Sequence, residues 1–343
     1  MKIRTAILGY GRSGSTLHAG AIANNPHDFE LAAVCDIDPA RREEAQKRFG
    51  CAVYADCREM LQRGPLDLVS IVTRSDQHCR MACDCLAAGV NVLVTKPWAV
   101  DATEAERMVQ AAEASGKRLL PWLPVRWASD LRRLRELVAA GTIGNVFLIR
   151  RLVSCFSRRN DWQTERQFGG GYLLNWGPHI LDSAVLLKGI PVKSVYAGMR
   201  QTINPGDTED LFLAVLTLTD GTLVTAEHTM AVDDLPNWFI QGDQGTIAAY
   251  GNRITIHRHT PAMPGDPTQY TGMRAVVSEK REETVGPDIY GDETVIYGEI
   301  AQALRGGKPF PVRPADALGL TRLLDAIRLS SETNRVVELE ESS

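Results

Sequence analysis

The sequence predicts an α/β chain in two parts, a doubly wound parallel sheet followed by an open, mostly antiparallel β-sheet flanked by helices. Three observations lead to this prediction. The first third alternates apolar runs with helix-like stretches, the remainder holds consecutive runs of alternating polarity, and 343 residues suit roughly two domains. We place the division between residues 1–122 and 123–343, and expect the last helix to pack back on the first part.

Composition and charge narrow the class of protein. Apolar residues make up 44% and charged residues 23%, as in ordinary globular chains. The net charge of −4 gives no general attraction to nucleic acid or anionic lipid. The N-terminal apolar run ends at Gly9, and no window approaches 18 apolar residues, so neither a secretory signal nor a membrane span is expected. Seven cysteines without a C-x-x-C pair favour free thiols, a cytoplasmic location and no metal site.

Apolar runs predict four strands in the first part, at 3–8, 31–35, 66–72 and 90–94. Because these runs lack polar alternation, they favour a parallel sheet covered by helices on both faces. The helices are expected at 14–24, 39–49, 77–88 and 101–115. Pro39 suits a first turn, and Asp101 can cap the helix that follows it.

The second part should open with a helix and continue mainly as strands. We expect helices at 129–140 and 172–187, with a strand at 145–154 and a polar segment between them. Further strands are expected at 192–199, 210–219, 222–230, 237–241, 246–249 and 253–258. Asp220-Gly221 is a favourable hairpin turn, so consecutive strands should pair antiparallel. Residues 259–287, rich in Pro, Gly and charge, are expected to form a loop before helices at 291–305 and 315–333.

A glycine motif stands in the first strand–helix turn, where residues 9–14 read Gly-Tyr-Gly-Arg-Ser-Gly. Gly9 permits the tight turn, Gly11 lets a pyrophosphate approach the backbone, and Gly14 lets helix and strand pack closely. Phosphates would then meet the free N–H groups at the helix N-terminus. Asp36 ends the next strand about 20 residues later, where a carboxylate accepts hydrogen bonds from the adenosine ribose. These features predict a Rossmann domain that binds a dinucleotide.

The carboxylate of Asp36 favours NAD, because it repels the 2′-phosphate of NADP. Arg41 and Arg42 would each suit such a phosphate, so NADP stays an alternative. We assign further cofactor contacts to residues of the glycine turn and of the segments after the later strands. These are Arg12, Ser13, Thr73, His78, Lys96 and Pro97.

Two places offer side chains for chemistry. Asn175 and His179 lie four residues apart on one face of the helix predicted at 172–187, with Asp182 near that face, and three preceding glycines leave the helix entry open to a ligand. Lys96 follows the strand at 90–94, and strand carboxyl ends face the ligand crevice of an open α/β sheet. Plainer interpretations exist for both, since a lone helical histidine is more often structural and a lysine at a strand end is commonly a solvated charge.

Several stretches together resemble the glucose–fructose oxidoreductase / inositol dehydrogenase / MocA family. They are GYGRSG, CDIDPARR, HCRMACDCLAAGVNVLVTKP, GGGYLLNWGPHILD and the closing run from GGKPFPV to NRVVEL, which together span nearly the whole chain. TKPWAV and GPHILD are most similar to the scyllo-inositol-dehydrogenase-like branch. The resemblance implies a Rossmann domain and a mostly antiparallel sheet whose face often builds dimers or tetramers. It also implies hydride transfer between a nicotinamide and a carbinol carbon of a sugar, cyclitol or sugar derivative.

The resemblance places the catalytic lysine at Lys96 and the catalytic histidine at His179. Oxidation of an alcohol releases a hydride and a proton, so an imidazole can act as the base while an ammonium stabilises the alkoxide. The sequence departs from the family pattern at Thr95, at Thr73-Arg74-Ser75 and, above all, at Asn175, where the family has an aspartate. We expect the Asn175 amide to orient His179 without stabilising its cation equally.

The expected substrate contacts are Lys96, Arg126, Trp162, Asn175 and His179. Two other functions stay open, an NAD-dependent glycosidase that works through transient oxidation and a non-catalytic NAD(P)-binding sensor. The expected partners are a small carbohydrate or cyclitol and copies of the chain itself, in a homodimer or homotetramer. Nucleic acid, membrane and metal are not expected.

Overall fold

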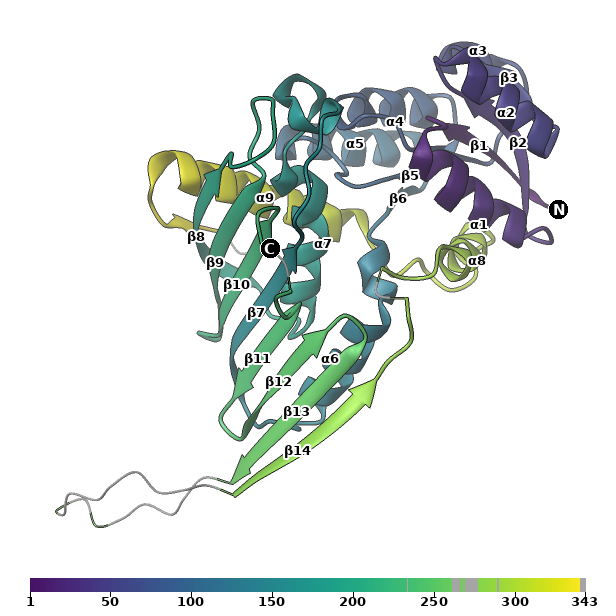
Figure 1. Ribbon diagram of the computed structural model, residues 1–343. Helices are drawn as coiled ribbons and strands as arrows, with labels where there is room; N and C mark the ends of the chain where they lie inside the picture. The colour runs from purple at the N-terminus through teal and green to yellow at the C-terminus, as the bar shows by residue number, and fades with distance from the viewer. Residues whose placement is uncertain (233, 261–265, 267, 269–276, 289, 340–343) are drawn as a thin grey trace.

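The computed structural model describes residues 1–343 except 233, 261–265, 267, 269–276, 289 and 340–343. Two sheets organise the chain (Figure 1). The first has six strands, all paired in parallel, in the order β3-β2-β1-β4-β5-β6. The second has nine strands in the order β14-β13-β12-β11-β7-β10-β9-β8-β15, antiparallel except where β7 meets β10. The predicted fold class is confirmed.

The strands of the first sheet are short, and all but the edge strand β3 are largely buried. They are β1 Ile3–Leu8, β2 Phe29–Cys35, β3 Ala52–Tyr54, β4 Leu68–Ile71, β5 Asn91–Val94 and β6 Leu119–Pro121. The sequence analysis missed β3 and β6, because three residues are too few to show a periodic pattern. Since β1 lies between β2 and β4, the strand order reverses there, and in such sheets ligands bind outside the carboxyl ends of the strands at this point.

Helices join these strands, close to the predicted places except for α3, which the sequence analysis missed. They are η1 Gly14–His18, α1 Ala19–Asn24, α2 Pro39–Phe49, α3 Cys57–Gln62, α4 His78–Ala87 and α5 Ala102–Ser115. The predicted helix at 14–24 begins as a π-helical turn, η1, before it continues as α1. Asp101 caps α5 by accepting a hydrogen bond from the Glu104 N–H at 2.8 Å, as its position in the sequence indicated.

The second sheet carries its helices on one face. The strands are β7 Val146–Ser154, β8 Val192–Arg200, β9 Leu211–Leu218, β10 Leu223–Thr229, β11 Trp238–Gly242, β12 Gly245–Tyr250, β13 Arg253–Thr260, β14 Val277–Thr284 and β15 Val337–Glu338. The helices α6 Ser129–Ala139, α7 Tyr172–Leu186 and α9 Pro314–Thr333 share a core with them. Along β9, Phe212 and Ala214 are fully buried, whereas Leu213 between them is 41% exposed, so the opposite face is open.

Strand β14 corrects the expectation of a loop over 259–287. It pairs antiparallel with β13, with Arg281 opposite Ile256. The segment is charged because it forms the edge of the sheet, where charged side chains prevent pairing with other chains. That position removes the apolar alternation by which a strand is recognised. Part of the predicted loop lies outside the described residues.

The two last long helices return to the first part. The helix α8 Glu293–Leu304 lies against α1, where the Asn25 side chain donates to the Thr294 carbonyl at 2.9 Å. The helix α9 lies against α5, where Asp325 accepts from the Ala102 N–H at 2.7 Å. Figure 1 shows α8 beside α1 and α9 along the second sheet. Because both helices also bond to the first part, the C-terminal residues tie the two sheets together. Among the described residues no helix is long and apolar enough to cross a membrane.

Candidate functional site

The glycine turn after β1 leaves space for a ligand at one of its three glycines. Gly9 has φ +89°, and a Cβ there would lie 2.7 Å from the Val72 carbonyl oxygen. A Cβ on Gly14 would lie 2.1 Å from the Gly9 carbonyl oxygen. A Cβ on Gly11 would meet nothing closer than the Arg41 guanidinium, at 3.7 Å. Packing therefore requires the outer two glycines, and the open space above Gly11 fits the approach of a pyrophosphate.

Asp36 lies beside this turn at the end of β2. Its carboxylate accepts from the Tyr10 N–H at 2.6 Å and from the Asp38 N–H at 2.9 Å. The Arg41 guanidinium is 3.5 Å away. Each carboxylate oxygen has a further lone pair, so Asp36 can also accept from ribose hydroxyls. Arg41 lies between Asp36 and Gly11, where a phosphate on the ribose would also be within its reach.

The sequence analysis assigned four further cofactor contacts to the segments after β4 and β5, and one of them, His78, joins these segments. Its Nδ1 lies 2.7 Å from the Pro97 carbonyl oxygen, and its Nε2 lies 3.1 Å from the Thr73 carbonyl oxygen. Burial lowers the pKa of His78, and a neutral imidazole can donate to only one of the two carbonyls. Both ring nitrogens already face the chain itself, so the geometry gives His78 a role in holding these segments.

Lys96, which follows β5, meets Asn175 of α7. The Lys96 Nζ donates to the Asn175 carbonyl oxygen at 2.7 Å and to its Oδ1 at 2.6 Å. Burial, assisted by the cations Arg159 and Arg12, lowers the pKa of Lys96 to about 7. The structure thus joins two predicted site residues that are far apart in sequence, one from each part of the molecule.

The side-chain amide of Asn175 bonds to residues other than His179. Its Oδ1 accepts from Lys96, and its Nδ2 donates to the Oε1 of Gln163 at 2.9 Å. The expectation that Asn175 orients the imidazole is wrong, because the one acceptor and the donor group of the amide face other partners. Gln163 was missed by the sequence analysis, since nothing distinguishes a single glutamine in a polar segment.

His179 lies one turn further along α7 and is 8% exposed. Its Nδ1 is buried and has no hydrogen-bond partner among the described residues. Burial holds the pKa of His179 well below 6.5, assisted by the cations Lys96 and Arg151. The imidazole is therefore neutral at pH 7.

The three glycines before α7 close on the chain itself. A Cβ on Gly169 would lie 2.8 Å from the Ser75 Cβ, and one on Gly170 would lie 2.6 Å from the Glu165 carbonyl oxygen. Gly171 has φ +106°, and its Cβ would lie 2.5 Å from a Glu209 carboxylate oxygen. The expectation that these glycines admit a ligand is wrong, because protein atoms occupy the space in front of each.

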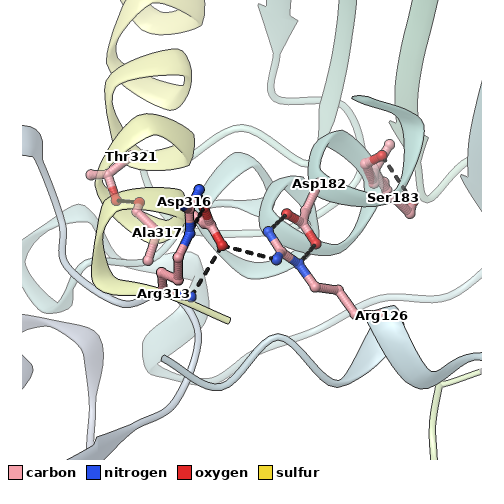
Figure 2. A network of polar contacts seen from close by, with 8 residues as sticks. Arg126, Asp182, Ser183, Arg313, Asp316, Ala317 and Thr321 are labelled. Carbon is pink, nitrogen blue, oxygen red and sulfur yellow. Dashed lines mark hydrogen bonds and ion pairs between the residues drawn. The ribbon is translucent and has the colours of Figure 1, made fainter. Parts of the chain in front are cut away.

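Arg126 lies in a network that joins three elements (Figure 2). It begins in η3 Pro124–Trp127 and makes two hydrogen bonds to Asp182 of α7, at 2.8 and 2.6 Å. A third nitrogen lies 3.2 Å from Asp316 of α9, which also pairs with Arg313. The Arg126 side chain is 14% exposed. The two carboxylates balance its charge, so the structure indicates that Arg126 has a structural role in a buried ion-pair network. Substrate contact by Arg126 stays a prediction.

The other predicted contacts lie in the segment before α7 and in the glycine turn. Trp162 begins the short helix η4 Trp162–Thr164, the element that also carries Gln163. The carbonyl of Arg12 accepts from the Thr16 hydroxyl at 2.6 Å, and Ser13 caps η1 without a side-chain hydrogen bond to it. Within the described part of the chain, no group of three His, Cys, Asp or Glu side chains is placed to hold a metal ion.

Comparison with known proteins agrees with this geometry. Residues 3–121 match the profile of an oxidoreductase family with an NAD-binding Rossmann fold, and residues 131–248 match a GFO/IDH/MocA C-terminal domain. The chain is 26% identical to the scyllo-inositol 2-dehydrogenase (NADP+) IolW of Bacillus subtilis, over 98% of this chain and 96% of that one. It is 33% identical to D-glucoside 3-dehydrogenase of Escherichia coli, over 59% and 58%. A solved NAD-binding protein from Listeria innocua is 25% identical with a TM-score of 0.85, covering 100% of this chain and 98% of that one.

Proposed function

The chain belongs to the GFO/IDH/MocA family of NAD-binding oxidoreductases, and from this premise we propose that it transfers a hydride between NAD and a carbinol carbon of a sugar, cyclitol or sugar derivative. The contact between Lys96 and Asn175 carries the proposal. It joins the end of a strand in the nucleotide-binding sheet to the helix that bears His179. The reacting carbon would lie where these two parts meet.

In this proposal residues 1–122 bind the cofactor and residues 123–343 bind the substrate. The turn at Gly11 receives the pyrophosphate, and Asp36 receives the adenosine ribose. Bound NAD+ supplies the acceptor for the hydride. Arg41 beside Asp36 is the feature that would also admit NADP.

The proton of the substrate hydroxyl needs an acceptor within the site. We assign this role to Lys96, because a pKa of about 7 suits proton transfer near neutral pH. The low pKa of His179 makes it the weaker base. We assign to His179 a hydrogen bond that orients the same hydroxyl. This assignment exchanges the roles that the sequence analysis gave to the two side chains.

The substrate class follows from the chemistry of the site and from the relatives. The relatives' names specify scyllo-inositol and a D-glucoside, both polyhydroxylated rings. Aromatic side chains such as Trp162, which the sequence analysis placed among the substrate contacts, suit the apolar faces of such rings.

The open face of the nine-stranded sheet supports self-association. Tyr196, Leu213 and Leu223 are 44%, 41% and 45% exposed on β8, β9 and β10, on the side away from the helices. Apolar side chains grouped on one sheet face favour contact with a second copy. We propose a homodimer or homotetramer built through this face. The free thiols of the described cysteines fit a cytoplasmic setting.

The test is the absorbance of reduced nicotinamide after the protein is mixed with NAD+ or NADP+ and a panel of inositols, aldoses, sugar acids and glycosides. A signal with one member of the panel that is lost in His179→Ala supports the proposal. Release of an aglycone without net reduction of NAD+ would instead show a glycosidase. Binding of NADH without turnover of any compound would favour a sensor.

A further inference from the structure

We propose that Gln163 is a positioning residue, which fixes the end of the Asn175 amide that faces Lys96. The inference rests on the proposed function, since it concerns the same pair of side chains. Two hydrogen bonds carry it, from the Lys96 Nζ to the Asn175 Oδ1 at 2.6 Å and from the Asn175 Nδ2 to the Gln163 Oε1 at 2.9 Å.

The argument depends on the two unlike ends of a carboxamide. The ammonium of Lys96 only donates hydrogen bonds. It can therefore bond to the side-chain oxygen of Asn175, but not to the NH2 group of that amide. A half-turn of the amide would exchange them and leave Lys96 with the backbone carbonyl alone. The Gln163 oxygen accepts from the NH2 group and therefore selects the useful orientation. A carboxylate at position 175 would need no such selection, because its two oxygens are equivalent.

The backbone of Gln163 is itself held on both sides. Its N–H donates to the Asp161 carboxylate at 3.0 Å, and its carbonyl accepts from the Gly171 N–H at 2.9 Å. A Cβ on Gly170 would lie 2.7 Å from that carbonyl oxygen, so the glycine is what lets the segment approach α7. Gln167 in the same segment is exposed, and among the described residues its side chain bonds to Glu165 alone, which makes it a matched control.

The surroundings of Lys96 make the orientation of a neutral amide matter. The charged and titratable groups that interact with Lys96 come from the glycine turn, the segment before α7, α4, α7 and β10, and they are Arg12, Arg159, His78, His179 and His228. The two with a permanent charge are cations, which disfavour the ammonium. The two oxygens of Asn175 favour the ammonium by accepting hydrogen bonds from it. Turning the side-chain amide would remove one of these two hydrogen bonds.

The experiment measures the titration of Lys96 without any substrate. Protein labelled with 13C-lysine is titrated by NMR, and the Lys96 signal is assigned by its loss in Lys96→Met. Gln163→Leu should lower the pKa of Lys96 by about 0.4–1 unit, the equivalent of one ordinary hydrogen bond. Gln163→Glu keeps the acceptor and adds a negative charge, so it should raise the pKa of Lys96. Gln167→Leu should leave the titration unchanged.

A second arm separates orientation from general structural damage. In an Asn175→Asp background, Gln163→Leu should shift the pKa of Lys96 much less than in the parent chain, because a carboxylate presents an oxygen either way. Equal shifts in both backgrounds, or no shift with either Gln163 variant, would overturn the inference. Since no sugar is needed, this outcome is distinguishable from a failure of the proposed oxidoreductase activity.

Discussion

Two glycine clusters, one in each part of the molecule, look alike in sequence and differ in what lies in front of them. The turn at residues 9–14 leaves the space above Gly11 open except for the Arg41 side chain. The run at residues 169–171 is closed at every position by protein atoms within 3 Å of a built Cβ. A glycine therefore marks a close approach without saying whether a ligand or the chain itself approaches. The two parts depend on each other. The closed cluster packs against Gln163, Gln163 bonds to Asn175, and Asn175 bonds to Lys96 of the first part.

The largest effect should come from Lys96, the point where the two parts meet. Lys96→Met removes the proposed proton acceptor and should lower kcat by about 10²–10⁴-fold, the range for loss of a general acid or base. Binding of NADH, followed by its fluorescence, should change little. Lys193→Met, at an exposed position of β8, is the matched control. Unchanged turnover in Lys96→Met would contradict the proposal that the reaction takes place where the two parts meet at Lys96.

The next largest effect should come from Arg126, whose ion pairs join η3, α7 and α9. Arg126→Met leaves Asp182 and Asp316 without their shared cation and should lower the free energy of unfolding by about 3 kcal/mol, because breaking a buried ion pair strands a charge. Chemical denaturation measures this loss. The KM of a confirmed substrate should remain within about twofold. A large rise in KM with unchanged stability would show that Arg126 contacts the substrate instead.

A pair of alanine substitutions tests the two glycine clusters directly. Gly11→Ala should leave the melting temperature unchanged and weaken NADH binding by about tenfold or more, since its methyl group enters the space left for the pyrophosphate. Gly170→Ala should lower the free energy of unfolding by about 1–3 kcal/mol with little direct effect on NADH affinity. Thermal melts and NADH titrations of both variants provide the comparison.

Gly20→Ala is the control for both, because its Cβ meets no atom within 4 Å in α1. It should be neutral or slightly stabilising, since alanine favours helix. If Gly11→Ala unfolded the protein while Gly170→Ala abolished NADH binding, the assignment of the two clusters would be reversed.

The smallest effect should come from Arg41, which lies at the edge of the open cluster. Its ion pair with Asp36 is half exposed on the arginine side, so Arg41→Ala should change stability by less than about 1 kcal/mol. NADH affinity should be nearly unchanged, whereas NADPH affinity should fall by about threefold if the guanidinium meets a 2′-phosphate. Equal losses for the two cofactors would place Arg41 on the pyrophosphate.

The difference between the clusters also explains how far the sequence could be interpreted. Four of the six strands of the first sheet and the turn at Gly9–Gly14 were predictable, because strand, glycine spacing and Asp36 are local signals that agree with one another. Lys96 and His179 were also singled out, from their positions after a strand and on a helix and from the resemblance, and their roles stay predictions. The partner of Asn175 was not, since the contact with Gln163 depends on how a polar segment folds back over α7. Strand β14 was missed for a different reason: it is an edge strand, and its charged side chains remove the apolar alternation by which a strand is recognised.

The most direct test of the central claim is the pH dependence of kcat/KM for sugar or cyclitol oxidation. The pKa of Lys96 is about 7 in the folded protein, far below its ordinary value of 10.5, so the neutral amine that accepts the proton is present above pH 7 and is lost as the pH falls below it. The account predicts a rate that rises with pH and levels off above an apparent pKa near 7, with this transition absent in Lys96→Met. A rate that does not change through this range, or one that falls as the pH rises, would contradict it.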